Sequence, residues 1–192
     1  MTELDSLAQE VGVHGRTLRR AVERGLLRAA LRDAREVVIP PSERSYVRAR
    51  WPMMSRLLEA LRKHPNVRLA ALFGSVARGS EQPDSDLDVL VRLRRDDHRS
   101  RAELVDALQQ ASGRRIQLVS LEQAEESPLL LADVLSDGRV LVDRDGDWPR
   151  LRRRERQIIS RARAEDERLQ RLAWDAPAAL EQIAREMTAG SR

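Results

Sequence analysis

The chain has 192 residues, with 35 basic and 31 acidic side chains, few aromatic residues and no cysteine. The lack of cysteine excludes disulfides and thiolate-bound metals, and no run approaches the roughly 20 apolar residues of a membrane-spanning helix. We therefore expect a cytoplasmic protein whose core is built mainly from aliphatic side chains, in one large domain or two small ones.

Charge is distributed unevenly along the chain. Residues 1–64 hold 13 basic and 8 acidic residues, residues 65–145 hold 11 and 15, and residues 146–192 hold 11 and 8. A basic N-terminal segment suits a nucleic-acid surface. Lys63 is the only lysine, however, so a general preference for arginine accounts for part of the basic excess.

Residues 1–40 are expected to form a first domain, a helix-turn-helix. Apolar residues recur at helical spacing on both sides of a break at 12–15, and Gly25 suits a helix end. The segment resembles the helix-turn-helix of transcription regulators, whose second helix enters the DNA major groove. The resemblance implies a double-stranded operator as partner, bound by Arg16, Thr17, Arg19 and Arg20. A helical hairpin used for packing or protein contact stays open as the alternative.

Two short strand-like runs, 26–28 and 37–39, would add a small wing to this domain. Pro40-Pro41 then ends it, because proline cannot donate to a strand ladder. Residues 41–65 are expected to be a linker that holds a helix. Pro52 suits the first turn of that helix, and Pro65 its end.

Residues 66–145 alternate strand-like and helix-like segments. The pattern predicts strands at 67–73, 86–93, 116–121 and 139–142, and helices at 101–111 and 127–135. The expected fold class is therefore α+β, with a small central sheet covered by helices.

A glycine-serine turn and a pair of aspartates mark the start of this central domain. Asp86 and Asp88 leave the same face of a strand, so they could hold one hard cation such as Mg²⁺. Gly74 allows a tight turn, and a helix that begins there would offer free N–H groups to a phosphate. This layout suits phosphoryl-type transfer.

The residues Gly74-Ser75, Arg78-Gly79 and Ser85-Asp86-x-Asp88 resemble the minimal nucleotidyltransferases of the polymerase-beta superfold. The resemblance covers about residues 66–145. It implies that Gly74 and Ser75 hold the triphosphate of an NTP, with Arg78 and Gly79 supporting the loop or contacting phosphate. It also implies that Asp86 and Asp88 bind Mg²⁺ and serve as catalytic residues, whereas Ser85 suits a turn or a cap.

The family usually has a third carboxylate on the third strand, where it accepts the proton of the attacking hydroxyl. Here that position falls on Gln117, and the next acidic residue, Glu122, lies beyond the strand. Glutamine cannot act as a base, and base catalysis typically contributes about 10²–10⁴-fold. The sequence therefore predicts a slow enzyme or a site that has lost catalysis.

Residues 146–192 are expected to form helices. Their sparse apolar stripe suits a dimer or partner interface, and a last short helix is expected to start at Asp175. The arginines at 150–154 suit either nucleic acid or a solvated helix face. The stripe residues are Leu151, Ile158, Ile159, Ala162, Leu169 and Leu172.

Two functions follow from these features. One is a DNA-binding regulator, antitoxin-like or associated with phage defence, whose transferase domain senses a nucleotide or docks a toxin or defence component. The other is an active enzyme that moves an NMP from an NTP to a protein or RNA hydroxyl with Mg²⁺.

Overall fold

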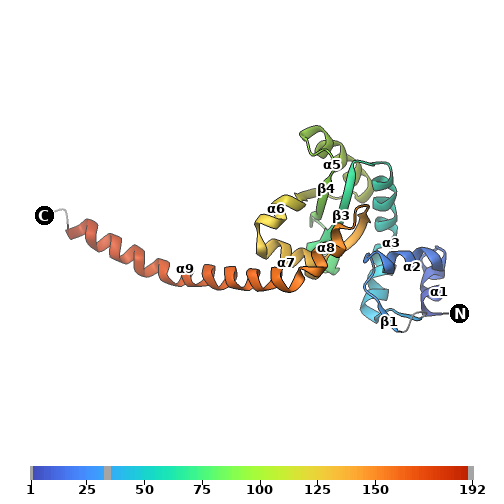
Figure 1. Cartoon of the computed structure of the whole chain (residues 1–192), viewed down its shortest axis with the longest axis horizontal. Helices are drawn as coiled ribbons and strands as arrows, with labels where there is room; N and C mark the ends of the chain where they lie inside the picture. Colours follow the sequence, from blue (N-terminus) through green and yellow to red (C-terminus); the bar gives the residue numbers. More distant parts are fainter. Residues whose placement is uncertain (1, 33–35, 190–192) are drawn as a thin grey trace.

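The computed structural model describes residues 2–32 and 36–189. A four-stranded sheet forms the centre, helices cover both of its faces, and a small N-terminal unit lies beside it (Figure 1). A long C-terminal helix extends away from this body. The predicted α+β architecture with a central sheet is confirmed. Within the described ranges, no helix is long and apolar enough to cross a membrane.

The sheet has the order β5-β4-β3-β6. Its strands are β3 (Val67–Phe73), β4 (Leu87–Leu93), β5 (Ile116–Ser120) and β6 (Arg139–Asp143). β3 pairs antiparallel with both β4 and β6, whereas β4 and β5 run parallel. β3 reads as a nearly continuous apolar run because both of its faces are covered, and six of its seven residues are buried.

Two layers of helices cover the sheet. On one face, α3 (Pro41–Arg62) and α5 (His98–Ser112) pack on Ala70, Leu72 and Val89. On the other face, Leu69, Phe73 and Leu90 pack under a second set of helices. That set comprises α6 (Leu121–Glu126), α7 (Pro128–Asp137), α8 (Asp147–Arg153) and α9 (Glu155–Ala189).

Two helix boundaries differ from the sequence prediction. α3 begins at Pro41 and runs through Pro52, where the helix was expected to start. Burial of Tyr46, Val47 and Trp51, at about 1.5–3 kcal/mol for a large apolar side chain, outweighs the roughly 3 kcal/mol cost of an internal proline. α9 likewise continues past Asp175 as one helix, because the preceding alanine, leucine and arginine are strong helix formers.

The N-terminal unit contains α1 (Glu3–Glu10), α2 (Gly15–Glu23) and an antiparallel pair, β1 (Ala30–Arg32) and β2 (Glu36–Val38). The first strand starts four residues later than predicted. Leu26 and Leu27 are buried, and both of their N–H groups donate to the carbonyl of Ala21 at the end of α2. These two leucines therefore close the helix instead of pairing in a strand ladder.

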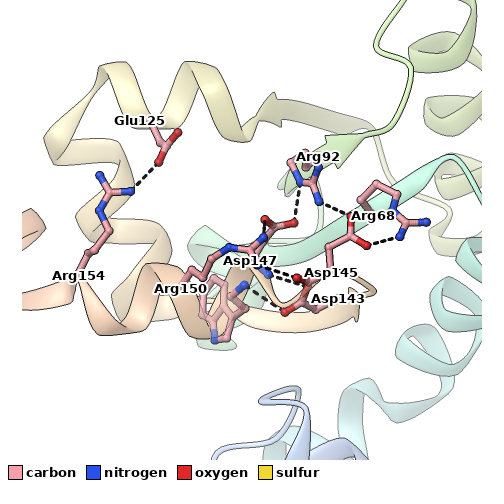
Figure 2. Close-up of polar contacts among 9 residues, drawn as sticks. Arg68, Arg92, Glu125, Asp143, Asp145, Asp147, Arg150 and Arg154 are labelled. Atoms are coloured by element: carbon pink, nitrogen blue, oxygen red, sulfur yellow. Dashed lines mark hydrogen bonds and ion pairs between the residues drawn. The ribbon is translucent and has the colours of Figure 1, made fainter.

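Ion pairs fix the turn between β6 and α8 against the sheet (Figure 2). Arg68 and Arg92 both donate to Asp145, and Arg92 also donates to Asp147 at 2.6 Å. The hydrogen bond from Arg68 holds the pKa of Asp145 well below its usual range. Arginines of the 150–154 run also bond within the protein: Arg150 to Asp147, Arg152 to Glu155 and Arg154 to Glu125.

One buried guanidinium joins the N-terminal unit to the sheet. Arg139 of β6 is 2% exposed and donates to both carboxylate oxygens of Glu43 in α3, at 2.6 and 2.9 Å. It also donates to the carbonyls of Leu26 and Ala77 and lies over the ring of Tyr46. Glu43 in turn accepts from the N–H of Arg28 at 3.0 Å. This pair therefore links four segments that are far apart in the sequence.

We expect Glu43→Gln to lower the free energy of unfolding by about 3–5 kcal/mol, because it leaves the Arg139 charge buried and uncompensated. The exposed pair of Lys63 and Glu59 offers a matched control, in which Glu59→Gln should change stability by less than about 1 kcal/mol. Urea denaturation measures both values. Equal stability of the two variants would show that the buried pair does not hold the units together.

Candidate active site

The end of β3 brings a glycine against a carboxylate. Phe73, the last residue of β3, pairs with Asp88 of β4. Gly74 follows with φ of +71°, and a Cβ built on it would lie 2.3 Å from Asp88 Oδ2. Glycine is required here for both its conformation and its size. The short helix α4 (Gly74–Arg78) therefore starts directly beside the Asp88 carboxylate.

The two aspartates lie close together at the start of β4. Burial raises the pKa of Asp88, and the charge of Asp86 raises it further, whereas Arg78 acts in the opposite direction. Asp86 Oδ1 is buried and accepts no hydrogen bond from the described residues, although Arg115 Nε lies 2.9 Å away as an ion-pair neighbour. A divalent cation would relieve the repulsion and satisfy this oxygen, so the two carboxylates fit such an ion.

The third strand of the site is β5, and its register places a glutamine next to the aspartates. Gln117 pairs with Asp88 in the parallel ladder, so both side chains leave the same face of the sheet. Gln117 is exposed. Within residues 2–32 and 36–189, no group of three histidine, aspartate or glutamate side chains is placed to hold a metal. The structure therefore puts Gln117 at the position where a third carboxylate was expected.

Other residues of the predicted site have structural contacts. Arg78 donates to Asp137 at the end of α7, and Gly79 ends α4 with φ of +80°. A Cβ at Gly79 would lie 3.0 Å from the ring of Tyr46. Ser75 is half-buried in the first turn of α4, and Ser85 Oγ accepts from the N–H of Gln82 in a turn.

Two neighbours of the site were not foreseen from the sequence. Arg115, which contacts Asp86, lies two residues before Gln117 and so shares its face of the strand. The two-residue spacing in the sequence could therefore have indicated that Arg115 lies beside the site. Asp137 is 59 residues from Arg78, and nothing in the local sequence indicates that the two side chains meet.

The four residues predicted to bind DNA are not part of this site. Arg16, Thr17, Arg19 and Arg20 all lie on α2. Three of them line a cavity that α2 shares with α3 and β6, whereas Arg19 does not line it.

Comparisons with known proteins agree with this geometry. The sequence profile of the family described as "Polymerase beta, Nucleotidyltransferase" matches residues 55–147. A Methanocaldococcus jannaschii protein with the provisional name protein adenylyltransferase MJ1379 is 32% identical in an alignment of 77 residues that covers 35% of this chain and 77% of that protein. The chain therefore belongs to the polymerase-beta nucleotidyltransferase family.

Solved structures of a toxin–antitoxin system are similar to the chain. A mutant MntA–HpeT toxin–antitoxin, with two aspartates two positions apart changed to glutamate, matches with 25% identity and a TM-score of 0.50. That match covers 64% of this chain and 97% of the other. A toxin–antitoxin structure with AMP-PNP matches with 26% identity and a TM-score of 0.49, over 64% and 97% of the two chains.

The raised pKa of Asp88 predicts that Asp88→Asn stabilises the protein when no divalent cation is present. The folded state holds a proton on Asp88 more tightly than the unfolded state does. Its contribution to stability therefore falls as pH rises through the interval between the unfolded and folded pKa values. We expect the variant to melt at a higher temperature than the natural protein at pH 7 in EDTA, with the difference shrinking towards pH 4.

Asp84→Asn is the control, because it removes the same charge from an exposed residue in the loop before β4. It should leave the melting temperature nearly unchanged across this pH range. A lower melting temperature for Asp88→Asn at pH 7 would contradict the assigned environment of Asp88.

Proposed function

We propose that the site binds an NTP with Mg²⁺ and transfers its NMP to a hydroxyl of a partner protein, at a rate limited by Gln117. The observation that carries the proposal is the cluster of Gly74, Asp86 and Asp88 at the paired ends of β3 and β4. AMP is the expected group, because the Methanocaldococcus relative carries the name of a protein adenylyltransferase.

Each part of the cluster has a defined task in this proposal. Gly74 and Ser75 bring main-chain N–H groups and a hydroxyl to the triphosphate, with no side chain at Gly74 to block it. Asp86 and Asp88 hold Mg²⁺, which supplies charge neutralisation on the phosphates when it is bound. Arg115 is 77% exposed, so its ion pair with Asp86 can open at a cost of at most about 1 kcal/mol.

Arg78 and Gly79 act mainly by positioning the phosphate-binding turn. The bond from Arg78 to Asp137 and the contact of Gly79 with Tyr46 fix the end of α4. The Arg78 side chain is 49% exposed, so it also places positive charge near the expected phosphates.

Gln117 determines what chemistry the site supports. Its amide can donate and accept hydrogen bonds but cannot take the proton of an attacking hydroxyl. Binding of nucleotide and orientation of the acceptor do not require that proton transfer, whereas rapid turnover does. The site therefore suits slow modification of a partner that stays bound, and it equally suits a nucleotide-sensing role without turnover.

We expect Gln117→Asp to raise the rate of NMP transfer by about 10²-fold or more, because it restores a base next to Asp88. Gln117→Asn is the matched control and should leave the rate at its natural level. The readouts are pyrophosphate release from ATP and label from [α-³²P]ATP on a co-purified partner. Asp86→Ala/Asp88→Ala should abolish both signals. Equal signals from this double variant and from the natural protein would exclude the site as the catalytic centre.

A protein partner is the second element of the proposal. The MntA–HpeT structure that resembles this chain is named as a toxin–antitoxin. α9 extends away from the body (Figure 1), and Leu169, Leu172 and Trp174 on it are exposed by 46%, 56% and 85%. These side chains offer apolar contacts to a toxin or defence component, or to a second copy of the chain. In an antitoxin-like role, the chain uses this surface to bind the partner and the transferase site to modify it.

Operator binding is a second candidate function. It is favoured by the short turn between α1 and α2 and by the antiparallel β1–β2 pair that follows, because a helix-turn-helix with a wing has this order. Arg16, Thr17, Arg19 and Arg20 would contact the duplex. Three of these residues, Arg16, Thr17 and Arg20, are exposed but also line a cavity with α3 and β6, which offers a competing use of the same face of α2.

If this unit binds an operator, the combined change of Arg16, Arg19 and Arg20 to alanine should weaken binding. It should also reduce the log–log salt slope by about 0.9 for each phosphate that the variant can no longer neutralise. Fluorescence anisotropy with labelled duplexes between 50 and about 200 mM salt gives the slope. If the three substitutions leave the DNA affinity and the salt slope unchanged, this unit does not bind an operator through these arginines.

A further inference from the structure

A cavity of about 730 Å³ lies between α2, α3 and β6. Sites for small molecules usually enclose about 300–1,000 Å³. The cavity is far from the candidate active site along the sheet. It is lined by β6 at Leu141–Arg144, and Asp143 pairs with Leu69 near the start of β3, whereas Asp88 pairs with Phe73 at the opposite end. It is therefore a separate place on the molecule.

The walls carry positive charge that no described residue neutralises. Arg16 and Arg20 of α2 and Arg24 at its C-terminal cap recur every four residues, and Arg62 of α3 also lines the cavity. None of these four side chains forms an ion pair or hydrogen bond within the part of the chain that the structure describes. An anion with several charges would match them, because guanidinium groups bind phosphate through paired, charge-assisted hydrogen bonds.

The remaining charged groups of the lining are already engaged. Arg144 donates to the main-chain carbonyls of Leu61, His64 and Val67. Asp143 is the one carboxylate among the lining residues. It accepts from the N–H groups of Asp147 and Trp148 at the start of α8 (Figure 2). Arg144 and Asp143 carry opposite charges, so the four arginines give the lining its net positive charge.

Part of the lining is apolar. Leu58, Leu141 and Val142 lie beside Trp51, whose side chain is almost completely buried. The indole Nε1 of Trp51 has no hydrogen-bond partner among the described residues. This nitrogen is closed to solvent, so Trp51 contributes its ring, and not its N–H group, to the cavity wall.

We infer that this cavity binds a nucleotide with two or more phosphates. The phosphates contact Arg16, Arg20, Arg24 and Arg62, and the base and sugar lie on the apolar wall beside Trp51. This site is independent of the proposed transfer reaction at Asp86 and Asp88.

The same arginines are exposed, so a duplex is the competing ligand. Its major groove is about 12 Å wide and receives a whole helix, whereas here the arginine side of α2 forms one wall of a concave site with α3 and β6. Two hydrogen bonds hold the segment after α2 against β6: Val140 N–H to the carbonyl of Gly25 at 3.1 Å, and Arg139 to the carbonyl of Leu26 at 3.2 Å. The geometry therefore favours a mononucleotide over a duplex.

The indole N–H signal of Trp51 reports on this cavity directly. The full chain is labelled with ¹⁵N-tryptophan, and Trp51→Phe assigns the signal. We expect ATP in EDTA to shift the Trp51 signal to saturation, and to do so equally in Asp86→Asn/Asp88→Asn. Arg16→Gln/Arg20→Gln should weaken binding by about tenfold or more. Arg19→Gln, on the same helix but outside the cavity, should have no effect.

Further probes distinguish the nucleotide from other anions. Inorganic tripolyphosphate should bind more weakly than ATP, because it lacks a base and sugar for the apolar wall. The inference is overturned if tripolyphosphate binds as tightly as ATP, if no saturable shift occurs, or if binding ignores Arg16 and Arg20. It is also overturned if binding disappears in the Asp86/Asp88 variant, or if a DNA duplex instead of ATP produces the arginine-dependent shift.

Discussion

The pairing of β3 with β4 places Phe73 opposite Asp88, and this register brings the glycine turn and the aspartate of the candidate active site together. Because of it, the backbone at Gly74 turns within reach of the Asp88 carboxylate, in a space that even a methyl group would fill. The parallel pairing of β4 with β5 then sets Gln117 beside the same carboxylate. A shift of one residue in either ladder would send these side chains to the opposite face of the sheet. The apolar runs that bury both faces of β3 and β4 are therefore what hold the chemistry in place.

The arginines of this chain have different tasks according to their surroundings. Arg139 is buried and joins the N-terminal unit to the sheet through Glu43. Arg115 pairs with Asp86, and the charge of Arg78 acts on Asp88. A third set on α2 and α3 faces a cavity and is left without carboxylate partners among the described residues. Basic residues of the N-terminal segment thus line a concave anion-binding surface. Their number does not by itself indicate that the segment binds nucleic acid.

Much of the central domain could be predicted from the sequence because its signals are local. Long apolar runs marked the strands, and the glycine and the two aspartates had to lie where two strands meet. Counting along the third strand pointed to Gln117, which the ladder pairs with Asp88, because a strand alternates faces strictly. The helix boundaries at Pro52 and Asp175 were wrong because burial and the neighbouring helix formers outweigh a local proline signal.

The arrangement of the units could not be predicted, since it depends on contacts between distant residues. Glu43 and Arg139 are 96 positions apart, and the pair bonds Leu26 and Arg28, which follow α2, to β6 and α3. The ion pair of Arg78 with Asp137 likewise joins residues that lie far apart in the sequence. Neither pairing leaves a periodic or local pattern in the sequence, so the cavity between α2, α3 and β6 becomes visible only in the folded chain.

Asp86 and Asp88 are proposed to complete a cation-dependent nucleotide site. Equilibrium dialysis of the full chain with a non-hydrolysable ATP analogue, in Mg²⁺ and in EDTA, measures this dependence. We expect Mg²⁺ to add a component of binding to the natural protein, and we expect this component to be absent from Asp86→Asn/Asp88→Asn. An Mg²⁺-dependent component of equal size in the variant would show that the two aspartates do not bind the cation.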